Sequence, residues 1–150
     1  MSDKNIQIYD AENMVVGRLG SKVAKAALLG KQVVIVNCEK AIITGDRRTV
    51  IDAFKEKHKI RTSYNPRKGP FHEKRPDKMI RKMIRGMLPW PTPRGKDAYK
   101  RIACYIGVPE KFEETEKIVL EKSKYHSLSG NYITVQELSH ELGWRNTEVI

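Results

Sequence analysis

The run QVVIVN at residues 32–37 constrains the fold most, because a continuous stretch of β-branched residues is typical of a strand buried on both faces. The segment IQIYDA, residues 6–11, predicts a short strand before it. Residues 17–29 between the two predict a helix that ends at Gly30. Strand, helix and strand in this order form a βαβ unit with a right-handed crossover, so we expect an α/β fold with parallel strands.

Further along the chain, helices are expected at residues 49–59 and 77–88, a strand at residues 102–108, and partly helical structure at residues 110–124. Thr134 and Glu137 match a capping box for a last helix that closes at Gly143. Its side facing the body would contain Val135, Leu138 and Leu142. A length of 150 residues fits a single domain over residues 1–150.

The positive charge is concentrated in the middle third of the chain. Residues 47–101 hold eighteen Lys and Arg against five Asp and Glu, whereas residues 1–46 are nearly balanced and residues 102–150 are acidic. A surface made only for solubility would intersperse both signs. Such segregation favours a polyanion, bound by neutralising its phosphates, and a nucleic acid fits better than a membrane surface.

Two proline-containing stretches, residues 61–76 and 89–96, are rich in Lys and Arg and have little to bury, so we expect irregular basic extensions. Residues 77–88 between them predict a helix with two different sides. Lys78, Arg81, Lys82 and Arg85 fall on one face, and Met and Ile residues fill the other. We interpret this helix as a clamp with its apolar side on the core and its cations on phosphates.

No pattern for catalysis, a metal or a cofactor emerges, so we expect neither an enzyme nor a cofactor. Cys38 and Cys104 form no CxxC pair, the histidines lack zinc spacing, and both cysteines are expected to be buried thiols. Gly17 and Gly20 in VVGRLGSK match neither a dinucleotide loop nor a P-loop, so close packing at Gly20 is favoured over a phosphate site. A nucleotide-dependent enzyme that uses this loop is the alternative from a different class.

The chain also shows no targeting signal. It has no apolar run of the roughly 18 residues that span a membrane, and its N-terminus lacks the features of a signal peptide. We therefore expect a cytoplasmic protein.

Several motifs together resemble a known family. GPFHEKRP, IRGMLP, RGKDAYKR and YIGVP, together with VVGRLGSKVAKAALLGK and VVIVNCEKAIITG, resemble the universal large-subunit ribosomal protein family thirteen over roughly residues 5–110. NPRKGPFHEKRP and PWPTPRG are closer to its archaeal and eukaryotic branch than to the bacterial one. The resemblance implies a three-layer α/β/α domain with a short, mostly parallel sheet, and a structural protein that braces large-subunit ribosomal RNA beside other ribosomal proteins and joins the subunit early in assembly.

The resemblance and the charge map together suggest which residues face RNA. The expected RNA-binding residues are Arg18, Lys22, Arg61, Arg67, Lys68, His72, Lys74, Arg75, Arg81, Lys82, Arg85, Arg94, Lys96, Lys100 and Arg101. Gly69, Gly86, Pro89 and Gly95 are expected to shape the backbone for close approach to RNA. Tyr64, Phe71, His72 and Trp90 would stack on bases, although docking on the core is equally open for Phe71 and Trp90. An RNA-binding regulator that acts off the ribosome is a third reading of the same surface.

Overall fold

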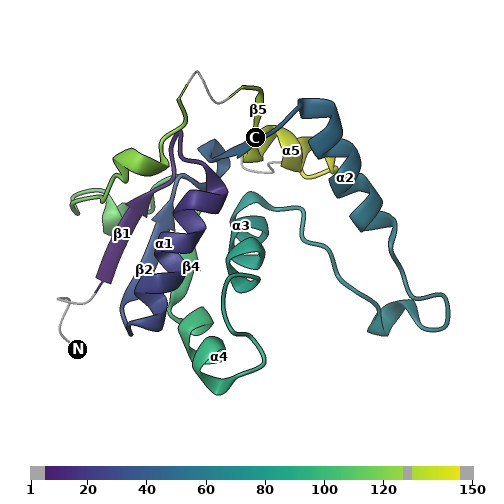
Figure 1. Ribbon diagram of the computed structural model, residues 1–150, viewed down its shortest axis with the longest axis horizontal. Helices are drawn as coiled ribbons and strands as arrows, with labels where there is room; N and C mark the ends of the chain where they lie inside the picture. The colour runs from purple at the N-terminus through teal and green to yellow at the C-terminus, as the bar shows by residue number, and fades with distance from the viewer. Residues whose placement is uncertain (1–5, 127–129, 146–150) are drawn as a thin grey trace.

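The predicted strand–helix–strand opening is present in the computed structural model, which describes residues 6–126 and 130–145 (Figure 1). Strand β1 (Ile6–Asp10) pairs in parallel with β2 (Gln32–Val36), and helix α1 (Val16–Leu28) connects them. The helix ends where predicted, because Gly30 adopts φ +90° and donates its N–H to the carbonyl of Ala27. The βαβ prediction is therefore confirmed.

A third parallel strand, β4 (Ile102–Cys104), lies on the other side of β2 and gives the sheet order β1-β2-β4. This strand is shorter than the predicted strand at residues 102–108. Tyr105 still donates to the carbonyl of Ile35, but Gly107 has φ +65° and accepts from the N–H of Asn37. The chain after Cys104 therefore bonds to the turn that follows β2 and ceases to extend the ladder.

The three-residue strand β3 (Ile42–Thr44), which the sequence pattern did not predict, pairs antiparallel with β5 (Tyr132–Thr134) in a separate two-stranded sheet. Helix α5 (Val135–Glu141) follows β5 directly, and the predicted capping box between Thr134 and Glu137 is confirmed. Its predicted inner residues, Val135, Leu138 and Leu142, are all buried.

The middle of the chain forms three further helices. Helix α2 (Arg47–Lys59) begins at Asp46, whose carboxylate accepts from the N–H of Thr49. Helix α3 (Pro76–Arg85) corresponds to the prediction for residues 77–88 but ends one turn earlier. The prediction of an irregular stretch at residues 89–96 was wrong from Pro93 onward, because α4 (Pro93–Lys100) starts there, with the Thr92 hydroxyl as its cap and proline in its first turn.

The sheet has unequal layers on its two faces. The face that contains Tyr9, Val33 and Ile35 packs against α1, α3 and α4 in the main core. The opposite face buries Ile8, Val34 and Val36 beneath Val108 and Phe112, where Phe112 belongs to the 3-10 turn η4 (Glu110–Phe112). The predicted α/β fold with a short, mostly parallel sheet is confirmed, and the thin layer on this second face is a turn and its neighbouring loop.

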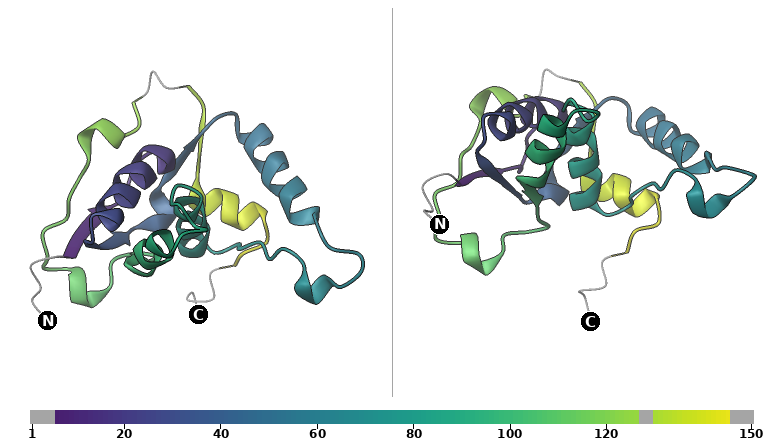
Figure 2. Two further views of the ribbon diagram at one scale, coloured as in Figure 1. Left: turned by 60° about the horizontal axis from the view of Figure 1, so that its bottom comes forward. Right: turned by 90° about the horizontal axis from the view of Figure 1, so that it is seen from below.

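Two segments have little regular structure. Residues 60–75, which we call the excursion, leave α2, reverse at the 3-10 turn η3 (Pro66–Lys68) and return to α3, as predicted, and Figures 1 and 2 show them extending from the body. Residues 110–124 are helical in part, as predicted, and the helical parts are the two 3-10 turns η4 and η5 (Glu121–Ser123). Across the two described ranges, no helix is long and apolar enough to cross a membrane.

Candidate nucleic-acid interface

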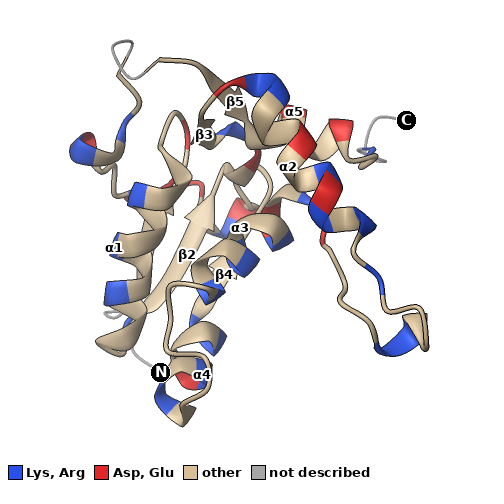
Figure 3. Ribbon diagram, turned by 45° about the vertical axis from the view of Figure 1, so that its right-hand side comes forward, with Lys and Arg blue, Asp and Glu red and all other residues tan. Residues whose placement is uncertain are grey.

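Cations are spread over elements that adjoin one another in space. Figure 3 shows Lys and Arg on α1, α2, α3 and α4 and at the turn of the excursion. Helix α1 contacts both α3 and α4, so helices that are far apart in the sequence and carry cations lie next to one another. We call the cations of α1, α3, α4 and the excursion the basic surface.

Helix α3 has the two sides that the sequence predicted. Met79, Ile80 and Ile84 are buried in the core, and the cations point away from it. Arg81 and Arg85 are each placed on an aromatic ring, which the sequence did not predict. The guanidinium carbon of Arg81 lies 4.5 Å from the ring centre of Tyr99, and that of Arg85 lies 5.0 Å from the ring centre of Trp90.

The two rings that support these arginines also contact each other. Trp90 and Tyr99 meet edge to face with their centres 5.1 Å apart. Cations stacked on aromatic faces lose side-chain freedom before any ligand arrives, while the guanidinium edges stay available for hydrogen bonds. The four side chains therefore hold two guanidinium groups in fixed positions on α3, ready for a phosphate.

Other cations of α3 fasten the returning leg of the excursion. Lys82 donates a hydrogen bond from Nζ to the carbonyl of Phe71, and Lys78 Nζ lies 4.0 Å from a carboxylate oxygen of Glu73. These contacts hold the excursion beside α3 although it buries little apolar surface of its own. The position of this leg relative to α3 is thus set by polar contacts.

The remaining predicted RNA-binding residues are mostly exposed. On α1 these are Arg18 and Lys22, on α4 Arg94, Lys96 and Lys100, and in the excursion Arg61, Arg67, Lys68, Lys74 and Arg75. Arg75 is paired with Asp77 at 3.2 Å and Lys100 with Asp97 at 3.4 Å. Arg101 differs from the others, because it is half-buried and donates to the carbonyl of Ala27 at the end of α1.

The aromatic side chains divide into two groups. Tyr64 and Phe71 in the excursion are 98% and 67% exposed, so both are open to a stacking partner. Trp90 is engaged by Tyr99 and Arg85, and His72 is half-buried with its ring centre 5.0 Å from that of His58. Trp90 is therefore docked within the domain, whereas Phe71 is exposed on the surface.

The predicted backbone-shaping residues serve contacts within the chain. A Cβ atom on Gly95 would collide with the carbonyl of Pro89, and one on Gly69 would lie 3.1 Å from Oγ1 of Thr62 in the opposite leg of the excursion. Gly86 ends α3 in an ordinary helical conformation, with φ −65°. Gly69 and Gly95 thus allow close packing of the protein on itself, which is a different reason from the close approach to RNA that we expected.

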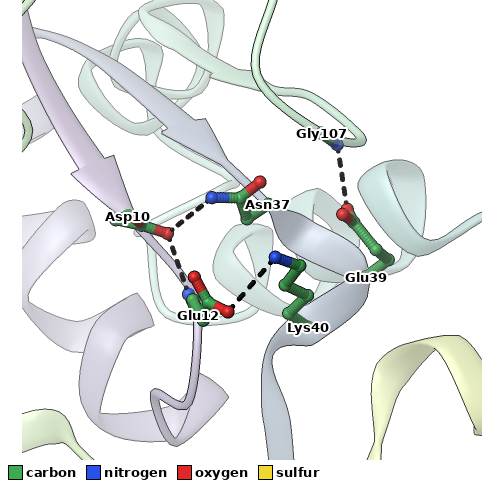
Figure 4. A network of polar contacts seen from close by, with 6 residues as sticks. All are labelled: Asp10, Glu12, Asn37, Glu39, Lys40 and Gly107. Carbon is green, nitrogen blue, oxygen red and sulfur yellow. Dashed lines mark hydrogen bonds and ion pairs between the residues drawn. The ribbon is translucent and has the colours of Figure 1, made fainter. Parts of the chain in front are cut away.

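The alternative nucleotide site finds no support at Gly20. A Cβ atom there would lie 2.9 Å from Sδ of Met87, so this glycine allows α1 to pack against the turn after α3. Ligands of open parallel sheets bind beyond the carboxyl ends of the strands. Here polar contacts within the chain occupy that edge: Asp10 accepts from Asn37, and Glu39 accepts from the N–H of Gly107 (Figure 4).

Comparison with known proteins decides the family. The family model described as Ribosomal protein L13 matches residues 4–111. The chain belongs to the ribosomal protein L13 family. The relatives include the large ribosomal subunit protein uL13 of Archaeoglobus fulgidus, 41% identical over 92% of this chain and 88% of that protein, and that of Methanopyrus kandleri, 45% identical over 92% and 87%. The uL13 protein of Saccharolobus solfataricus is 37% identical over 94% and 95%.

These L13 relatives are all archaeal, which confirms the archaeal-type branch expected from the motifs. The matched segment, residues 4–111, includes the whole sheet β1-β2-β4 and every helix of the basic surface. The relatives align over more of the chain than the family model, so their similarity reaches beyond this segment.

The two cysteines of this L13 member are closer in space than their sequence separation suggests. Cys38 follows β2 and donates from Sγ to the carbonyl of Ile35, and Cys104 ends β4, where it pairs with Ile35. The neighbouring Cys104 side chain and the burial of Cys38 raise the pKa of the Cys38 thiol well above the ordinary range. Cys38 is buried as predicted, whereas Cys104 is partly exposed. In the part of the chain that the structure describes, no three His, Cys, Asp or Glu side chains are grouped to hold a metal ion.

Two residues of the L13 surface escaped sequence analysis. Tyr99 supports Arg81, and the ring of His58 in α2 contacts the ring of His72 in the excursion. The sequence does contain a signal for the position of Tyr99, because Thr92 followed by Pro93 is a helix start that places residues 93–100 on a helix. His58 gave none, since its partner lies on a segment without periodicity.

Proposed function

We propose that this chain is a constituent of the large ribosomal subunit that binds and stabilises folded ribosomal RNA through the basic surface. The supporting observation is the concentration of eighteen Lys and Arg in residues 47–101, most of which lie on α3, on α4 and in the excursion, while the apolar sides of α3 and α4 are buried in the core. The L13 relatives are named as large ribosomal subunit proteins. The expected cytoplasmic location fits, because large ribosomal subunits are cytoplasmic. The role is structural and requires neither catalysis nor a cofactor.

The proposed RNA-binding residues fall into two classes by how they are held. Arg81 and Arg85 are fixed on Tyr99 and Trp90, so they would make oriented, two-pronged contacts to phosphate. The exposed cations are not held on aromatic rings and can follow the RNA backbone. These are Arg18, Lys22, Arg61, Arg67, Lys68, Lys74, Arg75, Arg94, Lys96 and Lys100. Of these, Arg75 and Lys100 would exchange their carboxylate partners for phosphates. Such contacts recognise the shape of folded RNA, since its helices hide most base edges from side chains.

Early entry into assembly is part of the proposal. The domain has a continuous core beneath the basic surface, built from α1, α3, α4 and the sheet. A protein with its own core is folded before it meets RNA and can bind before its neighbours are present. Depletion of the chain from cells should therefore accumulate large-subunit precursors that sediment more slowly than the mature particle.

The decisive experiment reverses the charge of fixed and free cations separately. Arg81→Glu with Arg85→Glu, and Arg94→Glu with Lys96→Glu, should each weaken binding to purified large-subunit ribosomal RNA by more than about tenfold. Lys111→Glu with Lys117→Glu, in the acidic third of the chain, is the matched control and should bind more nearly like the unmodified protein. Circular dichroism establishes that each variant is folded, and unchanged affinity in both test variants contradicts the proposal.

The ribosomal assignment has its own test. In a sucrose gradient of cell lysate, the protein should travel with large subunits and intact ribosomes in stoichiometric amount. A protein confined to the soluble fractions at low salt would instead favour an RNA-binding regulator.

A further inference from the structure

A pocket of about 200 Å³ lies between α2, α3 and the returning leg of the excursion. Phe54, Met79 and Met83 give it an apolar wall. Lys57 and Lys82 stand beside this wall, together with Glu73. His58 from α2 and His72 from the excursion complete the lining. The pocket therefore combines an apolar interior with cationic neighbours, and three separate segments of the chain build it.

The two histidines carry polar atoms that the chain leaves unused. Nε2 of His58 and Nε2 of His72 are shielded from solvent, and neither has a hydrogen-bond partner among the described residues. Buried polar atoms are nearly always hydrogen-bonded, so two in the lining of one pocket favour a ligand that supplies hydrogen-bonding groups. Nδ1 of His58 lies 2.7 Å from the carbonyl of Phe54. Since a carbonyl only accepts, Nδ1 carries the proton, and Nε2 of neutral His58 presents a lone pair.

We infer that this pocket takes one unpaired RNA base, which lies against the apolar wall and donates an N–H to Nε2 of His58 once the two histidine rings turn to expose that nitrogen. This inference rests on the proposed function, because it specifies how the RNA is held at one point. A planar ring with polar edges matches the lining: apolar contact on one side and hydrogen-bonding nitrogens at the histidines. Recognition of unstacked bases is the usual way in which proteins read folded RNA.

The surroundings favour a base within a chain over a free small molecule. His72 also lines two adjoining cavities along the excursion, one of about 330 Å³ with Arg61 and Lys74, and one of about 750 Å³ with Arg81 and Arg85. Cations therefore extend on both sides of the pocket. A nucleic-acid strand following them would carry its phosphates past the pocket and present a base to His58 and His72.

The test compares short, unstructured oligoribonucleotides with a matched oligomer in which ribose lacks its base. The base-containing oligomers should bind the full-length protein at least about fivefold more tightly. Replacing His58→Phe and His72→Phe together keeps two aromatic rings but removes the nitrogens, and should reduce this ratio by about threefold or more. His140→Phe, on the exposed side of α5, is the control and should leave the ratio unchanged.

A nuclear magnetic resonance measurement reads the site directly. The Nε2 signals of His58 and His72 should shift when a base-containing oligomer is added and stay in place with the oligomer that lacks bases. Equal affinity for the two oligomers overturns the inference but leaves the proposed function intact, provided that Arg81→Glu with Arg85→Glu weakens both. Failure of either oligomer and of ribosomal RNA to bind overturns both proposals.

Discussion

Gly95 lies so close to Pro89 that a Cβ atom on Gly95 would come within 2.1 Å of the Pro89 carbonyl oxygen. The same oxygen accepts hydrogen bonds from the N–H and the hydroxyl of Thr92, the cap of α4. The start of α4 is therefore fixed against the turn after α3 by a contact that only glycine allows. Because α4 supplies Tyr99 to support Arg81, this packing reaches the basic surface.

Gly95→Ala should destabilise the domain at the upper end of the roughly 1–3 kcal/mol typical of overpacking, because the opposing atoms are backbone and cannot rotate away. Gly17→Ala is the matched control, since nothing lies within 4 Å of a Cβ atom at Gly17 in α1. This control should gain about 0.5–1 kcal/mol from the better helix propensity of alanine. Urea unfolding measures both, and equal stabilities would contradict the described packing.

The exposed cations of α4 should dominate the salt dependence of RNA binding. Each phosphate contact that is lost lowers the slope of log affinity against log salt concentration by about 1. Arg94→Gln and Lys96→Gln should each show this decrease with large-subunit ribosomal RNA. Lys111→Gln should show a much smaller change in this slope. If the slope is the same in all three variants, Arg94 and Lys96 do not contact phosphates.

Glu141 should make the attachment of α2 dependent on acidity. It accepts from Arg47 at 2.9 Å and lies 3.8 Å from Lys55, so it joins α5 to α2. The hydrogen bond from Arg47 is the main cause that lowers the pKa of Glu141 below its usual value. Because the pKa of Glu141 is lower in the folded than in the unfolded protein, these ion pairs stabilise the fold fully above the unfolded-state pKa. The stabilisation is lost as the pH falls through the folded-state pKa.

Hydrogen exchange of the α2 amides tests this attachment. Glu141→Gln should increase their exchange at neutral pH, and the unmodified protein should approach the variant in acid. Glu121→Gln is the control, because its ion pair with Lys124, at 2.9 Å, is local and distant in sequence from α2. Exchange in α2 that is identical in all three proteins would show that the ion pairs contribute nothing.

Ionisation of the Cys38 thiol should lower the free energy of unfolding at alkaline pH. Its pKa is raised in the folded protein by the neighbouring Cys104 side chain and by burial, so the unfolded chain loses the thiol proton first. Stability should therefore fall by roughly 1.4 kcal/mol per pH unit above about 8.5 from this group alone. Cys38→Ala is less stable at neutral pH through lost packing, and the difference should narrow as pH rises. A constant difference between about pH 7 and about pH 10 would contradict this origin.

The sequence determined most where apolar residues repeat regularly. The strand at residues 32–37, the helix closed by Gly30 and the capping box at Thr134 were all predictable from local patterns, because each depends on neighbours in the chain. Strand β3 was not, since three residues carry no periodicity and its pairing with β5 joins segments about ninety residues apart.

The basic surface was predictable in composition but not in arrangement. Charge counting identified the cations of α3, yet the ring beneath Arg81 belongs to α4 and the ring beneath Arg85 to the turn before it. The sequence pattern predicts irregular chain over that turn and over the start of α4. The internal contact of Arg101 with Ala27 depends on how α1 and α4 pack, which no local pattern contains. Tertiary packing thus decides which cations are oriented, which are free and which are used internally.

The sheet order has a consequence for synthesis on the ribosome. Strand β2 lies between β1 and β4, and Val33 pairs with Ile102. One edge of β2 therefore stays unpaired until β4, sixty-nine residues later in the chain, has been synthesised. Closing so long a loop is entropically unfavourable until β4 has left the exit tunnel. A nascent chain released up to α3 therefore exposes one edge of an apolar strand together with most of its positive charge. Such a chain is prone to aggregate with nucleic acid, and we expect it to depend on chaperones until β4 is in place.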